Sequence, residues 1–135
     1  MSKPLSMDSN VVIVDRGFDA SIVEVTDSLW AELDEKYGDF AGRSLISCFS
    51  FDADWPTWEV HPAGDEFVYL LEGDAEMVLA HPEGDEIVRL TEPGTFVIVP
   101  KNTWHTARIH APTRMLFVTP GEGTVNAEQP DRDED

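Results

Sequence analysis

From Arg43 onward the sequence is a succession of short β-prone segments separated by turn residues, and this pattern leaves few folds open to the chain. The first segment, 44–51, alternates at a period of two, as is typical of a strand with both faces covered. Further strands are predicted at about 57–61, 66–72, 75–80, 86–90, 95–99, 104–109 and 114–119. Strands of this length and spacing predict an all-β fold, either an antiparallel sandwich or a barrel.

The first 43 residues predict two strands and one short helix. Two β-branched runs, 11–14 and 21–25, have the composition of edge strands. An apolar stripe with helical spacing follows the candidate N-cap residues 26–28 and ends at Gly38; it consists of Leu29, Trp30, Leu33 and Tyr37. We therefore expect a single helix of about ten residues.

Length and composition indicate one soluble domain. A chain of 135 residues has room for one core and for no second catalytic domain. No apolar run approaches the ~18 residues of a membrane span, and the N-terminus lacks the apolar region of a secretory signal. The single cysteine, Cys48, permits no internal disulfide, so we expect a cytoplasmic protein.

The formal net charge of -18 is large for a chain of this size. Such a surface repels phosphate backbones and anionic membranes, so we expect neither nucleic acid nor a membrane as a partner. Part of the excess lies in the segment 128–135, which favours a strongly solvated surface as its explanation. Adaptation to a salty cytoplasm, where counterions screen acidic surfaces, is the alternative.

Three possible metal ligands are brought together by the segment 58–73. Glu59 and His61 stand two residues apart, so their side chains leave the same face of an extended strand. The residues 62–65, Pro-Ala-Gly-Asp, predict a turn, after which Glu66 begins a second strand beside the first. A fourth candidate, His105, follows a later strand.

These residues also carry a resemblance to a known family. The spacing of His61, Glu66 and Gly73 resembles the first motif of the cupins from its second histidine onward, and Gly94, Pro100 and His105 match the second motif. The resemblance covers about 44–121. It implies a jelly-roll barrel, also called a double-stranded β-helix, with 1–43 packing on it and 122–135 as an acidic, flexible tail.

The chain departs from the cupin motifs at four positions. Glu59 stands in place of the first histidine, Asn102 in place of a glycine, Ile109 in place of an asparagine and Ala53 in place of the opening glycine. Asparagine tolerates the left-handed conformation better than other non-glycine residues, so the change at 102 is mild. The carboxylate at 59 alters the expected metal preference.

Two imidazoles and two carboxylates suit zinc, iron, manganese or nickel, and the resemblance assigns these roles to Glu59, His61, Glu66 and His105. With a second carboxylate, the site is harder than a three-histidine site and favours manganese or iron(II) over copper. The alternative is a hydrogen-bonded polar cluster without metal, with Glu59 turned away.

Alternation along the strands predicts what surrounds the site. Val68, Leu70 and Ala107 are expected to face inward and to line the cavity. The tryptophans at 55, 58 and 104 are candidates for its rim, and the arginines at 43, 108 and 114 are candidates for holding an anion. Glu59 and Tyr69 are the candidate proton carriers.

Two histidines are expected to lie outside the site. The sequence from His61 to Glu66 has an echo, His81-Pro-Glu-Gly-Asp-Glu86, which lacks the preceding acidic residue and the following glycine at the family spacing. His81 is therefore predicted to be a loop histidine, as is His110.

Two functions remain open at this level. The resemblance implies a divalent-metal-dependent enzyme of the dioxygenase, isomerase or lyase type acting on a small polar molecule. The alternative is a non-catalytic module that binds metal or a small ligand and acts through a protein partner. In either case the resemblance implies a homodimer.

Overall fold

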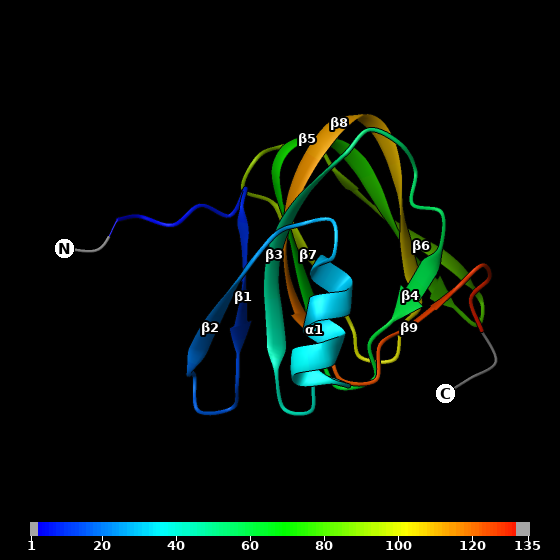
Figure 1. Cartoon of the computed structure of the whole chain (residues 1–135). Coiled ribbons are helices and arrows are strands. Elements are labelled where there is room, and N and C mark those ends of the chain that lie inside the picture. The colour runs from blue at the N-terminus through cyan, green and yellow to red at the C-terminus, as the bar shows by residue number, and fades with distance from the viewer. Residues whose placement is uncertain (1–2, 132–135) are drawn as a thin grey trace.

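The computed structural model describes residues 3–131, and in that range it contains one short helix and nine strands (Figure 1). The helix α1 spans Leu29–Tyr37 and ends at Gly38, as its apolar stripe predicts. The strands are β1 (Asn10–Val14), β2 (Ala20–Glu24), β3 (Ser44–Phe51), β4 (Trp58–Val60), β5 (Glu66–His81), β6 (Gly84–Leu90), β7 (Phe96–Val99), β8 (His105–Pro120) and β9 (Val125–Ala127).

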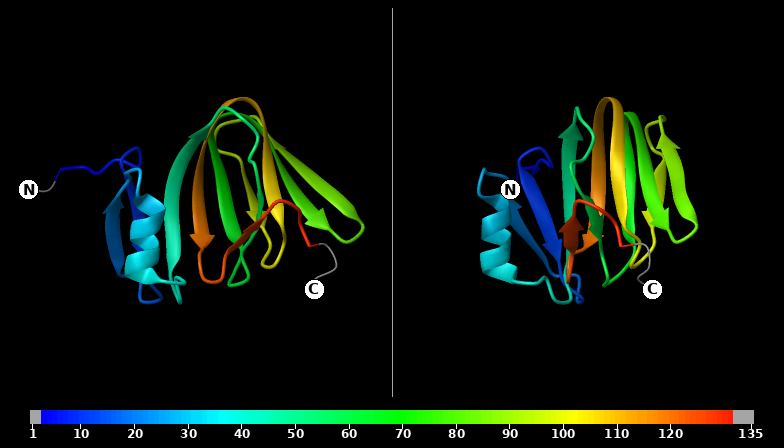
Figure 2. Two further views of the ribbon diagram at one scale, coloured as in Figure 1. Left: turned by 45° about the vertical axis from the view of Figure 1, so that its right-hand side comes forward. Right: turned by 90° about the vertical axis from the view of Figure 1, so that its right-hand side faces the viewer.

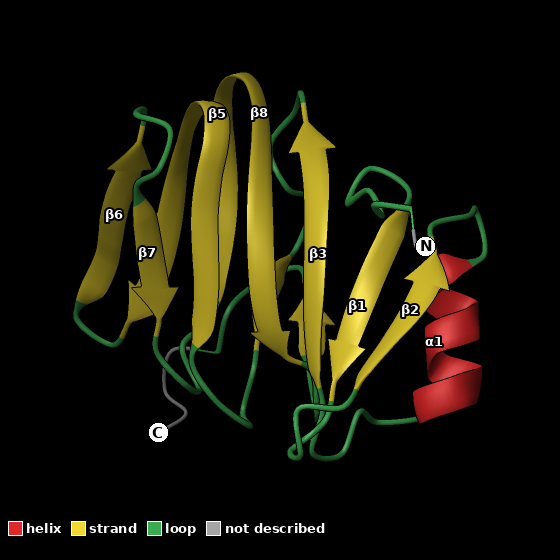
Figure 3. Cartoon of the chain, turned by 90° about the vertical axis from the view of Figure 1, so that its left-hand side faces the viewer, coloured by secondary structure: helices red, strands yellow, loops and turns green. Residues whose placement is uncertain are grey.

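All nine strands belong to one antiparallel sheet, which confirms the predicted all-β fold. The order β2-β1-β3-β8-β4-β9 forms one path, and β5 joins it by pairing with β8 while also pairing with β6 and β7. Figure 3 shows the sheet from its outer side, with α1 at the end that carries β2. Of the two predicted edge strands only β2 is at an edge, because β1 lies between β2 and β3.

The long strands β5 and β8 close the sheet into an open barrel. Both arch over at the top of Figure 1, so that β3 and β7 lie on one side and β4, β6 and β9 on the other, and Figure 2 shows the same arch from two further directions. Each was predicted as two separate strands. The sequence predicts that the first of these strands ends at Gly73, but in the structure β5 bends there and continues. Gly73 has a φ of 118°, and the pairing of β5 with β8 shifts register between Leu70 and Ala75.

Two apolar clusters fill the inside of the sheet. The larger lies within the barrel and includes Val68, Leu70 and Met115, each with no exposed surface. The smaller packs α1, through Leu29 and Leu33, against β1, β2 and β3. Its partly buried neighbour Phe49 also contacts the larger cluster, so the N-terminal segment is packed on the barrel rather than apart from it.

The segment after residue 121 contains a strand, although its polar, acidic composition predicts a flexible tail. Residues 125–127 form β9, which pairs with β4 beside the predicted site. A polar composition disfavours a core position, but an edge strand needs only backbone partners, and β4 supplies them. The division into residues 1–43, 44–121 and a flexible tail 122–135 stays a prediction, and positions 132–135 lie outside the described residues.

The outer face of the sheet carries an apolar row that crosses six strands. The paired residues, from β2 to β7, are Ile22, Val12, Ile46, Val118, Phe67 and Ile98. Ile22 and Ile98 are 49% and 44% exposed, and the other four are partly buried. A neighbouring row adds Phe96, which is 54% exposed and whose ring lies 5.0 Å from that of Phe67. We call these seven residues the outer apolar row.

Candidate metal centre

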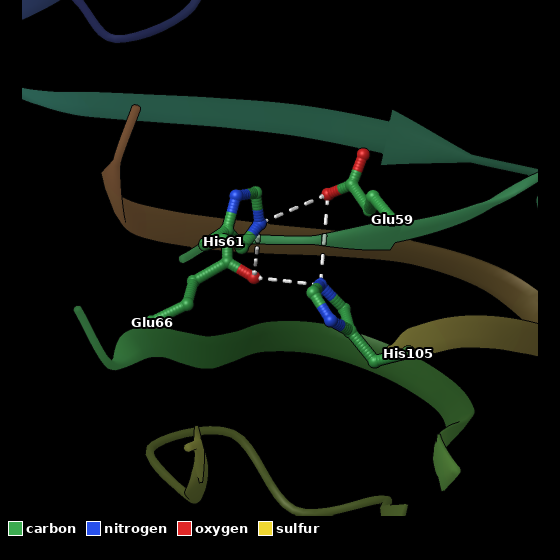
Figure 4. A group of neighbouring side chains, drawn as sticks. All are labelled: Glu59, His61, Glu66 and His105. Atoms are coloured by element: carbon green, nitrogen blue, oxygen red, sulfur yellow. Dashed lines mark ion pairs between the residues drawn. The ribbon is translucent and has the colours of Figure 1, made fainter. Parts of the chain in front are cut away.

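Strands from different parts of the chain bring the four predicted ligands together. Glu59 is in β4 and His61 follows that strand directly, while Glu66 and His105 are the first residues of β5 and β8. The side chains point toward one another inside the barrel (Figure 4). One nitrogen or oxygen of each residue lies within 4.8 Å of those of the others. Glu59 therefore points inward, and the alternative with its side chain turned away does not hold.

Glu66 lies at the middle of the group. Its Oε1 is 3.0 Å from Nε2 of His105 and 3.4 Å from Nε2 of His61. Oε1 of Glu59 is 3.4 Å and 3.6 Å from the same two nitrogens. Glu66 and His105 are 2% and 0% exposed, whereas Glu59 is 26% exposed. The group thus has a closed side formed by Glu66 and His105 and an open side at Glu59.

The remaining polar atoms of three members are held by threonine residues. Nδ1 of His105 lies 3.1 Å from the carbonyl oxygen of Thr103, and Nδ1 of His61 lies 2.8 Å from Oγ1 of Thr124. Thr119 donates a 2.6 Å hydrogen bond to Oε2 of Glu66. Because a carbonyl oxygen can only accept, Nδ1 of His105 carries a proton, and a neutral ring then has its lone pair on Nε2, facing the centre.

While the rings are neutral and protonated on Nδ1, the atoms that face the centre are buried and make no hydrogen bond. They are Nε2 of His61, Oε1 of Glu66 and Nε2 of His105. Unsatisfied buried polar atoms are costly, and three of them converging on one point is the arrangement that a cation satisfies. Second contacts that fix the ligand rings are also a general feature of metal sites. The donor set and its surroundings therefore fit a divalent metal ion.

Without a cation, the same group is held together by protons on the histidines. Burial alone raises the pKa of the Glu66 carboxyl, but its contacts with His105 and His61 outweigh burial and hold that pKa at about 2. Burial lowers the pKa of His105, but Glu59 and Glu66 raise it to about 10, and the pKa of His61 is also raised. A metal ion at neutral pH must therefore displace protons from the two rings.

A cavity of about 730 Å³ opens beside the group and reaches the surface. This volume is within the range of small-molecule sites. Glu59, His61 and Glu66 form one part of its wall, and α1 contributes Trp30 and Asp34 to another part. The cavity therefore gives a small molecule a path to the open side of the four-residue group.

The predicted cavity lining differs from the structure. Val68, Leu70 and Ala107 do face inward, as alternation requires, but they are at most 1% exposed and belong to the closed core of the barrel. None of them lines the cavity. The strand period gives the direction of a side chain but not how deep in the barrel it lies, and at these positions the barrel is filled.

Other sequence candidates divide between the cavity and the rest of the molecule. Trp55 lines the cavity, whereas Trp58 and Trp104 do not, and neither do the arginines at 43, 108 and 114. Tyr69, the second candidate proton carrier, alternates with the inward residues of β5, and its ring stacks on Phe67 of the outer apolar row at 6.0 Å. It therefore lies away from the group.

The two remaining histidines lie outside the site, but the prediction that they are loop residues is wrong: His81 is the last residue of β5 and His110 lies within β8. His81 contacts Glu86 at 2.9 Å, and His110 lies 3.5 Å from Glu76. Sequence reasoning did not identify the three threonines that hold the ligands. Thr103 stands two residues before His105, which is a detectable signal, but only the fold brings the later two threonines to their partners.

A comparison with one solved structure agrees with this architecture, and two further similar structures are given after it. An uncharacterised conserved protein with a double-stranded β-helix domain from Klebsiella pneumoniae is 22% identical, with a TM-score of 0.52 over 64% of this chain and 76% of that chain. A cupin superfamily protein from Desulfitobacterium hafniense is 26% identical (TM-score 0.48, 56% and 65%). Hydroxypropylphosphonic acid epoxidase from S. wedmorenis is 20% identical (TM-score 0.48, 56% and 43%).

The family comparison covers most of the barrel. A search of curated proteins found no match for the chain. In contrast, the family model described as the cupin domain matches residues 52–127, which include all four ligands of the group and extend through β9. Among residues 3–131, no helix is long and apolar enough to cross a membrane. The chain belongs to the cupin family.

Proposed function

We propose that the protein binds one divalent metal ion through Glu59, His61, Glu66 and His105 and uses it as an enzyme on a small molecule. The observation that carries this proposal is the convergence of three buried, unsatisfied atoms on one point at the wall of a cavity. Two carboxylates balance the charge of a divalent ion, and the donor set suits manganese, iron(II), zinc or nickel. Such an ion supplies a Lewis acid to an oxygen of the substrate.

The residues of this chain have defined parts in that proposal. The threonine contacts to His61, Glu66 and His105 fix the ligands before the ion arrives, so little reorganisation accompanies binding. Glu59 is the most exposed ligand and borders the cavity, so it is the group best placed to exchange a proton with a bound molecule. The three candidate reaction classes, dioxygenase, isomerase and lyase, are suggested by the family, and the residues of the site do not choose among them.

One observation favours a non-catalytic binding or sensing module as the second candidate. The cavity wall contains no lysine, tyrosine or cysteine, and the threonines Thr119 and Thr124 are already bonded to ligands. Oxygen uptake and product analysis with a panel of small thiols, diols and carboxylic acids separate the two. Turnover of any compound supports the enzyme, and tight metal binding without turnover, together with a co-purifying partner, supports the module.

The metal proposal is tested by replacing both histidines of the group with alanine. We expect the wild-type protein to bind about one ion per chain and the His61→Ala/His105→Ala variant to lose it, because half of the donor atoms are gone. The matched control is His81→Ala/His110→Ala, which removes the two histidines outside the group and should leave binding unchanged. Metal content is measured by mass spectrometry after dialysis. Equal metal content in the two variants would contradict the proposal.

We also propose that two copies of the chain pair through the outer apolar row. Six strands at a spacing of about 4.8 Å make this row roughly 24 Å long, so it extends across several strands of the sheet. For a chain with a net charge of -18, a row without charged side chains is where a second copy can approach with least repulsion.

A charge within the outer apolar row should prevent this pairing. We expect light scattering to give twice the chain mass of 15.1 kDa for the wild type and the single mass for Phe96→Asp. Phe18→Asp is the control, because Phe18 is 86% exposed and lies outside the row, and it should remain a dimer. A wild-type mass of one chain would refute the proposal.

A further inference from the structure

The side chains that line the cavity have an unusual charge distribution. Their four carboxylates belong to Asp34, Asp54, Glu59 and Glu66, and none of the lining residues is a lysine or an arginine. A cavity that binds a carboxylate or phosphate normally supplies a cation or a fork of guanidinium donors. This wall supplies none.

The three arginines that are candidates for holding an anion are engaged elsewhere. Arg43 lies over the ring of Tyr37 at 5.2 Å, Arg108 lies 3.8 Å from Glu76, and Arg114 is paired with Asp8. Neither these arginines nor their partners line the cavity. For one of the three to bind an anion there, it would have to leave its partner.

The loaded metal centre does not replace the missing cation. With neutral imidazoles, the two positive charges of the ion are cancelled by Glu59 and Glu66, so the centre has no formal net charge. Asp34, on α1, then leaves the cavity mouth negative, and no described residue forms an ion pair with it. An anionic ligand would meet like charge at the mouth and no compensating charge at the centre.

The walls instead offer aromatic surface. The ring of Trp55 lies 5.5 Å from Phe51, 5.9 Å from Phe117 and 6.3 Å from His105, so aromatic rings extend from the cavity to the ligand group. Trp30 of α1, which also lines the cavity, lies 6.0 Å from Phe49. Aromatic side chains on a cavity wall favour a flat aromatic guest and, through their faces, a positive charge.

We propose that the cavity takes an aromatic molecule with a neutral or positively charged polar group and discriminates against carboxylates and phosphates of the same shape. This inference rests on the proposed function in one respect, that the cavity beside the ligand group is the ligand site. It adds the substrate class, which the four ligands do not determine.

Three naphthalene compounds of nearly equal shape test the charge preference. They are 2-naphthoate, 2-naphthalenemethanol and 2-naphthylmethylammonium, titrated into the zinc-loaded protein at pH 7 by calorimetry. We expect the neutral and cationic compounds to bind and 2-naphthoate to bind at least tenfold more weakly than the alcohol. A smaller ratio, or no binding by any of the three, would overturn the proposal.

A pair of variants on α1 separates the cavity from the general negative charge of the protein. Asp34→Asn should reduce the preference for the ammonium over the alcohol by about two- to fivefold, the range expected for a partly exposed ion pair. Glu35→Gln removes the same charge one residue away, from a side chain that does not line the cavity, and should leave the preference unchanged. Equal effects of both variants would show that the cavity does not select the charge, contrary to the proposal.

Failure of this inference is distinguishable from failure of the proposed function. If the wild type contains no metal, the metal proposal fails by direct analysis. The same three titrations on metal-free protein then still test the charge preference of the cavity walls, because the positions of Asp34 and the aromatic rings do not depend on the ion. If metal binds but 2-naphthoate is preferred, only the substrate class is wrong.

Discussion

Replacing Glu66 with glutamine is expected to lower the affinity for a divalent ion by at least a hundredfold. The side chain is 2% exposed, and its Oε1 contacts both histidines of the group, so it is the central donor of the site. Glutamine preserves the shape but removes the charge, leaving Glu59 as the only carboxylate against a doubly charged ion. Loss of an outer contact to a ligand already costs about 10–100-fold, and loss of a ligand charge costs more. Calorimetric titration with zinc and manganese measures the change.

The echo of the first motif provides the control for this experiment. Glu86→Gln makes the same chemical change at the equivalent position of the second His-Pro-x-Gly-Asp-Glu sequence, where the carboxylate is 56% exposed and contacts only the ring of His81 among the ion pairs of the described chain. Its metal affinity should equal that of the wild type. If Glu66→Gln also bound zinc with wild-type affinity, the carboxylate would have no part in the site.

Replacing Gly73 with alanine is expected to destabilise the fold by about 3 kcal/mol or more. The residue has a φ of 118°, and a Cβ atom there would lie 2.5 Å from the Cα of Thr113 and 2.6 Å from the carbonyl oxygen of Pro112. These are backbone atoms of β8, so the clash cannot be relieved by rotating a side chain. Thr113 also accepts a hydrogen bond from the amide of Asp74, which the displacement would break. Urea unfolding measures the loss.

A second glycine separates the clash from the backbone conformation. Gly84 has a φ of 141°, but a Cβ atom there would have no neighbour within 4 Å. Gly84→Ala should therefore cost only the conformational penalty, about 1–2 kcal/mol. Equal losses of stability in the two variants would mean that the close approach of β5 and β8 at Gly73 adds nothing to the cost of the Gly73→Ala substitution.

The four residues of the group were predictable because their positions follow from local geometry. Residues two apart on a strand share a face, which aligns Glu59 with His61, and a turn of four residues returns Glu66 to the same region. His105 came from the second motif, and its pairing with Glu59 in the sheet confirms that the two segments are adjacent. Asn102, in place of a glycine, has a φ of 63°, as the tolerance of asparagine for this conformation predicts.

What the sequence did not predict depends on contacts between distant segments. Thr119 reaches Glu66 across 53 positions of the chain, and Thr124 reaches His61 across 63. Neither threonine stands in a pattern that distinguishes it from the other hydroxyl residues. The sequence also did not predict that α1 borders the cavity. Its apolar stripe predicts packing, and Leu33 is buried as expected, but the same helix also contributes to the cavity wall.

The position of Thr124 has a consequence for how the protein matures. The nitrogen of His61 that faces away from the centre is held by a residue encoded near the end of the barrel, just before β9 pairs with β4. During synthesis, most of the barrel and all four ligands leave the ribosome before this residue does. A nascent chain therefore lacks this contact to His61 until Thr124 has been added and β9 can pair with β4.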